Sequence, residues 1–275
     1  MSETPPPRIL LFDSGTGGLT VARAVAEALP QAHLIYAADN GAFPYGAWEE
    51  GALIERILAV MSLLIAKSRP DLVVIACNTA STLAIWRLRE RFPDIPFVGT
   101  VPAIKPAAAL SKTGVIGVLA TPGTVRREYT KALIDTYASH CTVILHGAHG
   151  LAALAEDKLY GKAPDRRQIL REIRPVFRKR KGRQTDTVAL GCTHYPLLLE
   201  ELTAMAPWPV TFLDPAPAIA RRVVQVLAER GRQPGEINGA VAPSTLMLTA
   251  RPVAERVLDA YAVLGFANHM VMPAS

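Results

Sequence analysis

Two of the three cysteines occupy matching positions in the chain. Cys77 follows the apolar run LVVIA and Cys192 follows the run TVALG, and after each cysteine the sequence becomes polar. A thiol between a buried strand and a helix lies near backbone N–H groups and the positive end of the helix dipole, which favour the thiolate. Forming a thiolate at neutral pH costs only about 2 kcal/mol. The pair therefore predicts thiol chemistry, whereas Cys141, which starts a strand pattern, is predicted to be a packing residue.

Each of these two cysteines has a titratable partner in the predicted arrangement. His194 stands two residues after Cys192 and titrates near neutrality, so it can exchange a proton with that thiol or act as a cation beside it. Asp13 ends an earlier apolar run at the same predicted sheet edge as Cys77, where it can orient that thiol or move its proton. A zinc site needs three or four ligands, and Cys192 with His194 supplies only two. We therefore expect no metal.

Further polar residues at these junctions and in neighbouring loops could bind a small diacid. Hydroxyl, amide and backbone groups suit an ammonium group and two carboxylates. The candidates are Ser14, Tyr45, Gly46, Asn78, Thr79, Thr121, Thr124 and Thr193. The segment DSGTGG at 13–18 matches neither the phosphate-loop spacing nor the dinucleotide-binding spacing, so it does not indicate a nucleotide site.

Short apolar runs alternate along the chain with segments of helical periodicity. The runs are almost continuously apolar, which is typical of parallel strands covered on both faces. Strands that alternate with helices predict an α/β fold with right-handed crossovers. The predicted strands are Ile9–Phe12, Leu34–Ala37, Leu72–Ala76, Pro96–Gly99, Val115–Leu119, Thr142–Leu145, Thr187–Leu190 and Val210–Leu213. The predicted helices are Trp48–Lys67, Thr79–Arg91, Val125–Tyr137, Arg166–Lys179, Leu197–Met205, Ala216–Glu229 and Pro252–Leu264.

The two halves of the chain resemble each other. The segments RILLFDSGTGGLTV at 8–21 and GVIGVLATPGTV at 114–125 each combine a strand, a loop of small residues and a helix start. Cys77 follows 64 residues after Asp13 in the first half, and Cys192 follows 71 residues after Thr121 in the second. This repeat predicts two pseudo-symmetric lobes, each a mostly parallel sheet flanked by helices. We assign residues 1–98 with 210–275 to the first lobe and 99–209 to the second. Because ligands bind at the carboxyl ends of such sheets, we expect the active site in a cleft between the lobes, flanked by both cysteines.

Composition narrows the class of protein. The 275 residues are half apolar and one-fifth charged, with a formal net charge of +6. No apolar run approaches the roughly 20 residues of a membrane span, and the opening residues lack a secretory pattern, so we predict a cytoplasmic protein without a membrane partner. Three cysteines argue against a disulfide framework and fit a reducing compartment. The basic run 174–183 is interpreted as a solvated helix end and loop, because no aromatic platform accompanies it, and we expect no nucleic-acid partner.

Four segments, in this order, carry a family resemblance. They are FDSGTGGL at 12–19, PYG at 44–46, ACNTAS at 76–81 and GCTHYP at 191–196. Together they resemble the signature segments of the aspartate/glutamate racemase superfamily, and the resemblance extends over nearly the whole chain. Thr193 and His194 are similar to the glutamate branch, because the aspartate branch carries an acidic residue where His194 stands.

The resemblance implies racemisation of glutamate by two thiols, without pyridoxal phosphate, metal or nucleotide. Cys77, assisted by Asp13, would act on D-glutamate, and Cys192, assisted by His194, on L-glutamate. Glu156 would fill the family's supporting acidic position. Asp13 and His194 would contact the substrate together with the polar candidates named above. The D-glutamate would feed bacterial peptidoglycan synthesis, and thereby cell-wall biogenesis and cell shape.

The residues leave three alternatives. Another racemase or isomerase of the superfamily would act on aspartate, hydantoins or maleate-like diacids. A non-catalytic amino-acid-binding or inhibitory protein on the same scaffold could use the basic run 174–183 to meet nucleic acid or a partner, although two intact thiols argue against it. A thiol hydrolase needs one Cys–His pair and an oxyanion hole, and it leaves Cys77 and Asp13 without a role. The sequence also leaves open whether the protein is a monomer or a homodimer.

Overall fold

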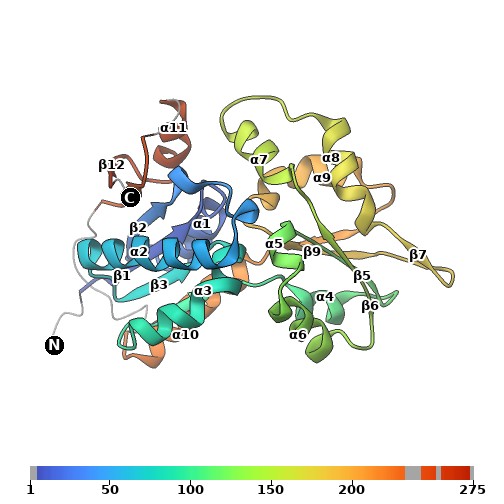
Figure 1. Ribbon diagram of the computed structural model, residues 1–275, viewed down its shortest axis with the longest axis horizontal. Helices are drawn as coiled ribbons and strands as arrows, with labels where there is room; N and C mark the ends of the chain where they lie inside the picture. The colour runs from blue at the N-terminus through green and yellow to red at the C-terminus, as the bar shows by residue number, and fades with distance from the viewer. Residues whose placement is uncertain (1–4, 233–242, 252–254, 273–275) are drawn as a thin grey trace. The chain divides into compact units, whose positions relative to one another are not determined.

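The computed structural model describes residues 5–232, 243–251 and 255–272 (Figure 1). Contacts within the chain divide it into two compact units. Unit 1 comprises residues 1–100 and 216–275, and unit 2 comprises residues 101–215. Each unit has its own sheet and its own covering helices, and each is described separately below.

Unit 1 is built on a six-stranded sheet in the order β12-β11-β2-β1-β3-β4, in which every adjacent pair is parallel. Helix α1 packs against α10, and α2 packs against α3. Because Ile9 and Leu10, on opposite faces of β1, are both fully buried, the sheet is covered on both sides. The strands are β1 (Arg8–Asp13), β2 (His33–Ala38), β3 (Leu72–Ile75), β4 (Phe97–Gly99), β11 (Thr245–Leu248) and β12 (Asn268–Val271). The helices are α1 (Leu19–Ala28), η1 (Asn40–Ala42), η2 (Tyr45–Ala47), α2 (Glu50–Ser68), α3 (Asn78–Arg91), α10 (Ala216–Glu229) and α11 (Arg256–Ala262).

Unit 2 contains a four-stranded parallel sheet in the order β10-β9-β5-β6. One face of this sheet packs against α7, α8 and α9, with Leu119 and Leu190 in the shared core, and the other face packs against α4 and α6 through Val118 and Ala189. The strands are β5 (Val115–Ala120), β6 (Thr142–Gly147), β9 (Thr187–Gly191) and β10 (Thr211–Leu213). The helices are α4 (Ile104–Leu110), α5 (Pro122–Val125), α6 (Glu128–Tyr137), α7 (Leu151–Leu159), α8 (Arg166–Ile173), η3 (Arg174–Val176), η4 (Tyr195–Leu198) and α9 (Leu199–Met205).

The predicted α/β class, with two lobes of parallel strands flanked by helices, is confirmed. The predicted lobe boundaries differ from these units in two respects. Residues 99–100 lie in unit 1, whereas the sequence placed them in the second lobe. Residues 210–215 lie in unit 2, whereas the sequence placed them in the first lobe, because Thr211–Leu213 pairs in parallel with β9 as strand β10. The predicted helix at 125–137 is interrupted between α5 and α6. Strands β11 and β12 were not predicted, and residues 252–254 of the last predicted helix lie outside the described residues.

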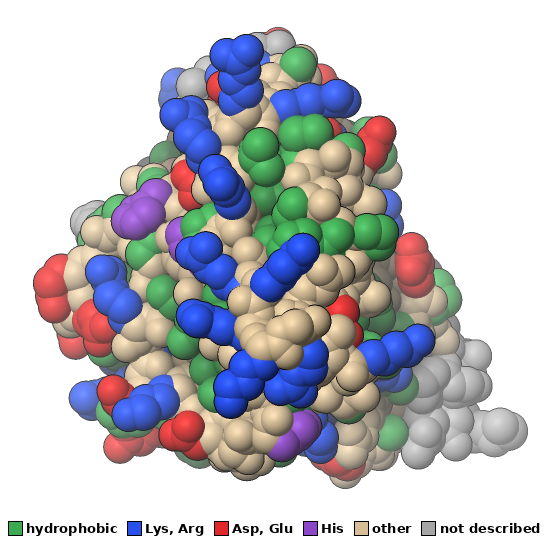
Figure 2. Space-filling view, turned by 90° about the vertical axis from the view of Figure 1, so that its right-hand side faces the viewer, with side chains coloured by type: hydrophobic (Ala, Val, Ile, Leu, Met, Phe, Trp, Pro, Cys, Tyr) green, Lys and Arg blue, Asp and Glu red, His purple; other side chains and the backbone are tan. Residues whose placement is uncertain are grey.

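The basic run 174–183 has a different structure from the expected helix end and loop. Helix α8 ends at Ile173, and Pro175 lies in the 3-10 turn that follows, where its lack of an N–H prevents a longer helix. The chain then forms a hairpin of β7 (Lys179–Arg180) and β8 (Arg183–Gln184), joined by two residues with positive φ. Such two-residue turns match the twist of paired strands. Figure 2 views the right-hand side of Figure 1, where β7 is labelled, and shows many exposed Lys and Arg side chains there.

No helix in the described ranges is both long enough and apolar enough to span a bilayer.

Candidate half-sites around Cys77 and Cys192

Cys77 lies where β3 passes into α3. Its backbone is extended, with φ −68° and ψ 119°, and it is the N-cap residue of the 14-residue helix α3. Cys77 is 6% exposed, so the residue is nearly but not completely withdrawn from solvent. The Ser14 Oγ lies 3.7 Å from the Cys77 Sγ, within the range of a weak hydrogen bond to sulfur. A helix N-terminus and a hydroxyl therefore both lie beside this sulfur, and both stabilise a thiolate.

Asp13 organises the glycine loop next to Cys77. It ends β1, the strand that pairs with β3, and its carboxylate is fully buried. The Oδ2 atom accepts hydrogen bonds from the backbone N–H groups of Gly15, at 3.3 Å, and Gly18, at 3.0 Å. A Cβ atom at Gly18 would lie 2.7 Å from the Tyr36 hydroxyl and 2.9 Å from the Asp13 Cβ, so only glycine fits there. Asp13 thus holds the Ser14 backbone in place at the edge of the sheet.

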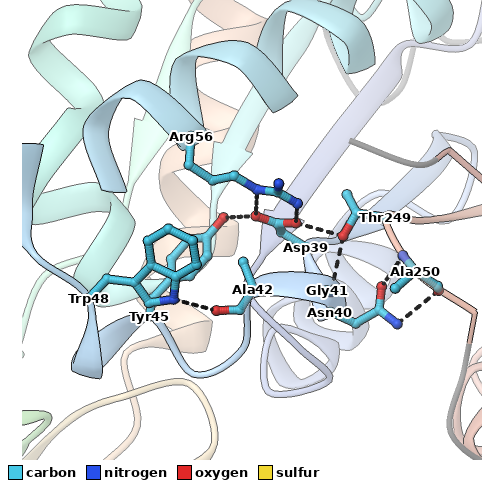
Figure 3. A network of polar contacts seen from close by, with 9 residues as sticks. All are labelled: Asp39, Asn40, Gly41, Ala42, Tyr45, Trp48, Arg56, Thr249 and Ala250. Carbon is cyan, nitrogen blue, oxygen red and sulfur yellow. Dashed lines mark hydrogen bonds and ion pairs between the residues drawn. The ribbon is translucent and has the colours of Figure 1, made fainter. Parts of the chain in front are cut away.

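A buried network centred on Asp39 fixes the loop that carries Tyr45 and Gly46 (Figure 3). Arg56 binds both carboxylate oxygens of Asp39, through Nη2 at 2.7 Å and Nε at 3.0 Å. The Tyr45 hydroxyl donates to Oδ2 at 2.5 Å, and the Thr249 hydroxyl donates to Oδ1 at 2.6 Å. Tyr45 was predicted as a substrate contact, but its hydroxyl is committed to Asp39. The Tyr45–Gly46 segment can therefore offer its backbone more readily than this hydroxyl.

Electrostatics keep the groups of this network in fixed protonation states. Burial alone would raise the pKa of Asp39, but hydrogen bonds from Arg56, Thr249 and Tyr45 and the charge of Arg56 outweigh it and lower that pKa. Burial and the neighbouring Asp39 charge raise the pKa of Tyr45 well above its usual value. Tyr45 therefore stays a neutral donor and Asp39 a charged acceptor. The turn η2 also contacts α3, which places the loop in the same packed region as Cys77.

Asn78 and Thr79 form the first turn of α3 directly after Cys77, and both are buried. Among the residues that the structure describes, neither the amide oxygen nor the amide nitrogen of the Asn78 side chain has a hydrogen-bond partner. A buried amide without a partner costs free energy, and native proteins rarely keep one without a reason. A polar ligand that contacts Asn78 would remove this cost.

In unit 2, Cys192 follows β9, and a chain of polar contacts runs from its sulfur. The Sγ atom lies 3.8 Å from Nδ1 of His194. The Nε2 atom of the same ring lies 2.7 Å from Oε1 of Glu156 in α7. The second carboxylate oxygen of Glu156, Oε2, accepts a hydrogen bond from the Tyr160 hydroxyl. All four residues come from two neighbouring segments, because α7 packs against η4.

The surroundings of His194 favour its cationic form. Burial of the ring alone would lower its pKa, but hydrogen bonds to Cys192 and Glu156, together with the negative charges of both, raise the pKa well above its usual value. A cation held beside a sulfur stabilises the thiolate. The arrangement Cys192–His194–Glu156 can therefore hold a proton on the imidazole while the sulfur acts as a base.

The two cysteines share a topology but differ in what surrounds them. β1 and β3 are adjacent parallel strands, as are β5 and β9, and each cysteine follows the second strand of its pair. Cys77 is the N-cap of a long helix, whereas Cys192 is followed by the short 3-10 turn η4 before α9 begins at Leu199. A helix dipole supports the first sulfur and an imidazolium supports the second. That the two sulfurs face one cleft stays a prediction.

The remaining predicted contacts lie at the corresponding edge of the unit 2 sheet. Thr121 is the N-cap of α5, where its Oγ1 accepts from the Thr124 backbone N–H at 3.2 Å and lies 3.0 Å from the Thr124 Oγ1. Thr124 and Thr193 are buried. Within the described ranges, no group of three or more His, Cys, Asp or Glu side chains is arranged to hold a metal ion. Cys141 is half-buried and packs against a core cluster of unit 2, away from both half-sites in the sequence.

Sequence reasoning missed four residues of these networks, one of which is Thr249. The other three are Asp39, Arg56 and Tyr160, and none of the four was a candidate because each is recognised only by what its side chain contacts. A helical spacing of four residues between Glu156 and Tyr160 was the one available signal, since residues so spaced lie on one face of a helix.

Comparison with known proteins identifies the family of the chain that carries these two groups of residues. The family model described as Asp/Glu/Hydantoin racemase matches residues 19–223, well over half of the chain. The chain belongs to the Asp/Glu/Hydantoin racemase family. This membership confirms the prediction of a racemase, which is an isomerase.

Within the Asp/Glu/Hydantoin racemase family, the chain is 52% identical over 226 residues to the glutamate racemase of Brucella canis, a match that covers 82% of each chain. The fold is similar to that of Escherichia coli glutamate racemase, solved with L-glutamate and the activator UDP-MurNAc-ala. That match has a TM-score of 0.88, 41% identity, and coverage of 98% of this chain and 99% of that chain. It is also similar to a glutamate racemase isoform from Bacillus anthracis, with a TM-score of 0.81, 26% identity and 98% coverage of both chains.

Proposed function

We propose that this protein interconverts L- and D-glutamate by proton transfer between two cysteines, without a cofactor. The observation that carries the proposal is the matched placement of Cys77 and Cys192, each after the second of two adjacent parallel strands and each beside groups that stabilise a thiolate. The high identity to glutamate racemases supports glutamate as the substrate rather than aspartate or a hydantoin.

In the proposed reaction, one proton is removed from the α-carbon and another is added to its opposite face. With D-glutamate, the Cys77 thiolate takes the α-proton, and the electron pair of the broken C–H bond stays on the α-carbon. The Cys192 thiol then donates its proton to the opposite face, which gives L-glutamate and leaves a thiolate beside His194. With L-glutamate the two sulfurs exchange roles. Hydrogen bonds to the substrate carboxylate stabilise the carbanion-like transition state.

The remaining site residues have supporting roles in this proposal. Asp13 and Ser14 support the Cys77 sulfur, and His194 with Glu156 supports the Cys192 sulfur. The substrate carboxylates and ammonium would be bound by polar groups at the two sheet edges, namely Asp13, Ser14, Tyr45, Gly46, Asn78, Thr79, Thr121, Thr124, Thr193 and His194.

The proposed product, D-glutamate, would serve peptidoglycan synthesis in the cytoplasm and thereby cell-wall biogenesis and cell shape. Depletion of the protein in its host should then be rescued by D-glutamate supplied in the medium, and not by L-glutamate. Rescue by neither enantiomer would count against this cellular role while leaving the chemistry intact.

Exchange of the α-hydrogen tests the reaction directly. Purified protein is incubated in deuterium oxide with L-glutamate and no added cofactor, and optical rotation and α-deuterium are followed together. We expect the rotation to decay to zero as deuterium enters the α-position. If both signals stay unchanged, the proposal is wrong. The same assay with L-aspartate and with a 5-substituted hydantoin separates glutamate from the other substrates of the family.

A further inference from the structure

The carboxylate of Glu156 is held from two sides. Its Oε1 lies 2.7 Å from Nε2 of His194, and its Oε2 accepts the hydroxyl of Tyr160. Glu156 is 6% exposed, so few water molecules can replace either contact. A carboxylate with one donor can rotate about its side chain, whereas donors on both oxygens fix its plane. Tyr160 is therefore one of the donors that decide where the Glu156 carboxylate points.

The end of α7 explains how Tyr160 reaches this position. Tyr160 is the C-cap residue of α7, one helical turn after Glu156, so the two side chains lie on one face. Gly161 follows with φ 78°, a conformation that favours glycine, and the chain turns away from the helix there. The Tyr160 hydroxyl can therefore donate to a carboxylate of its own helix.

Separate contacts anchor α7, so the Tyr160 hydroxyl is not required to hold the helix. Leu151, Leu154 and Ala155 of α7 belong to the apolar core of unit 2. An ion pair of 2.8 Å between Lys158 and Glu201 also ties α7 to α9. Removal of the Tyr160 hydroxyl should therefore change the orientation of Glu156 without unfolding the helix.

We propose that Tyr160 is a positioning residue for the Cys192 half of the reaction. It fixes Glu156, which orients the His194 ring, so that Nδ1 of that ring stays aimed at the Cys192 sulfur. The role in catalysis rests on the proposed function; the effect on the Cys192 sulfur does not.

Tyr160 keeps this role over the whole working pH range. Burial, the negative charge and hydrogen bond of Glu156, and the charge of Asp157 raise the pKa of Tyr160 far above its usual value. The hydroxyl therefore remains protonated and can only donate to Glu156. Phenylalanine at this position would keep the ring and its packing and would remove only the donor.

The test compares Tyr160→Phe, Glu156→Gln and the double variant with a matched control, Tyr129→Phe. Tyr129 is a tyrosine of the same unit with 47% exposure, and it lies on α6. Each protein is alkylated with iodoacetamide across a pH series, and mass spectrometry measures the modification rates of Cys77 and Cys192 separately. Urea unfolding of each variant reports its stability, and kcat and KM for both enantiomers are measured in parallel.

We expect Tyr160→Phe to move the alkylation profile of Cys192 upward by about half a pH unit, because a less firmly oriented imidazolium stabilises the thiolate less. The profile of Cys77 should not move. In the Glu156→Gln background, where the amide oxygen is a weaker acceptor than the carboxylate, Tyr160→Phe should add less than its full shift, since it acts through residue 156. kcat should fall about 3- to 10-fold with KM within about twofold, and Tyr129→Phe should match the wild type.

Three outcomes would overturn the proposal: an unchanged Cys192 profile in Tyr160→Phe, an equal shift at Cys77, or a full additional shift in the double variant. If Glu156→Gln does not fold, the comparison of the two cysteines in Tyr160→Phe still decides the question. A shifted Cys192 profile in a protein that does not racemise glutamate would uphold Tyr160 as a positioning residue and reject the proposed function.

Discussion

Nε2 of His194 lies 2.7 Å from a carboxylate oxygen of Glu156, while Nδ1 of the same ring lies 3.8 Å from the Cys192 sulfur. The ring is 2% exposed and is contacted at both nitrogens. A histidine held in this way can carry a positive charge although it is buried. The Glu156 carboxylate compensates that charge, and the charge in turn stabilises a thiolate at Cys192.

His194→Asn should lower kcat by about 100-fold in both directions, which is the lower end of the range for loss of an acid–base group. Because the pKa of His194 is raised, the ring is charged throughout neutral pH and loses its proton only as the pH rises through that higher value. The variant removes this positive charge from beside the Cys192 sulfur, so the dependence of the rate on pH should change. The measurement is a pH–rate profile, and His140→Asn, at an exposed histidine, is the control. A wild-type profile in His194→Asn would contradict the assignment.

The three cysteines offer a matched comparison. Cys77→Ser and Cys192→Ser should each reduce kcat/KM by at least about 100-fold, since serine is a far weaker acid than cysteine. Because the equilibrium between enantiomers is symmetrical, the loss should be equal in both directions. Cys141→Ser should keep wild-type turnover. Circular-dichroism and chiral-product assays give the rates, and a Cys77→Ser or Cys192→Ser variant that remains fully active would exclude the two-thiol reaction.

Asn78→Ala should weaken substrate binding without weakening the fold. The Asn78 amide is buried and, in the described part of the chain, has no hydrogen-bond partner, so its removal takes no internal bond away. A hydrogen bond to a charged ligand contributes about 1.5–3 kcal/mol, which corresponds to a KM about 10- to 100-fold higher. KM and the thermal midpoint of the ligand-free protein are the two readouts. A lower midpoint with unchanged KM would mean that Asn78 is structural.

Asp39→Asn should destabilise the protein by about 3 kcal/mol at pH 7, because it removes the carboxylate charge that faces the mostly buried guanidinium of Arg56. Urea unfolding measures the loss. Glu229→Gln, which breaks an exposed ion pair with Arg222, is the control and should cost less than about 1 kcal/mol.

Asp39→Asn should also change how the stability of the protein depends on acidic pH. The folded-state pKa of Asp39 is lowered, so its contribution to stability is complete above the unfolded value of about 3.9 and is lost as the pH falls through the folded value. Below about pH 4, the wild type should therefore lose stability faster than Asp39→Asn, and the two unfolding free energies should converge. Parallel curves down to low pH would mean that the Asp39 charge is not what stabilises this network.

The sequence alone was sufficient for the parts of the structure that are encoded locally. Continuous apolar runs identified the parallel strands β1, β3, β5 and β9, since a strand covered on both faces has no polar side. The polar residue after each run marked the end of its strand, which located Cys77 and Cys192 before any contact was known. The four motifs predicted the family for the same reason, because each is a short contiguous segment.

Only the tertiary structure decided which side chains contact one another. Asp39 and Thr249 are 210 residues apart, and no local pattern joins them, yet they share a hydrogen bond because β2 and β11 are neighbours in one sheet. Strand β10 joined unit 2 because its backbone pairs with β9, a choice that its apolar residues alone could not specify. The support of Cys192 by His194, Glu156 and Tyr160 arises in the same way. Hydrogen bonds require distances and angles that packing sets, whereas periodicity records only which residues are buried.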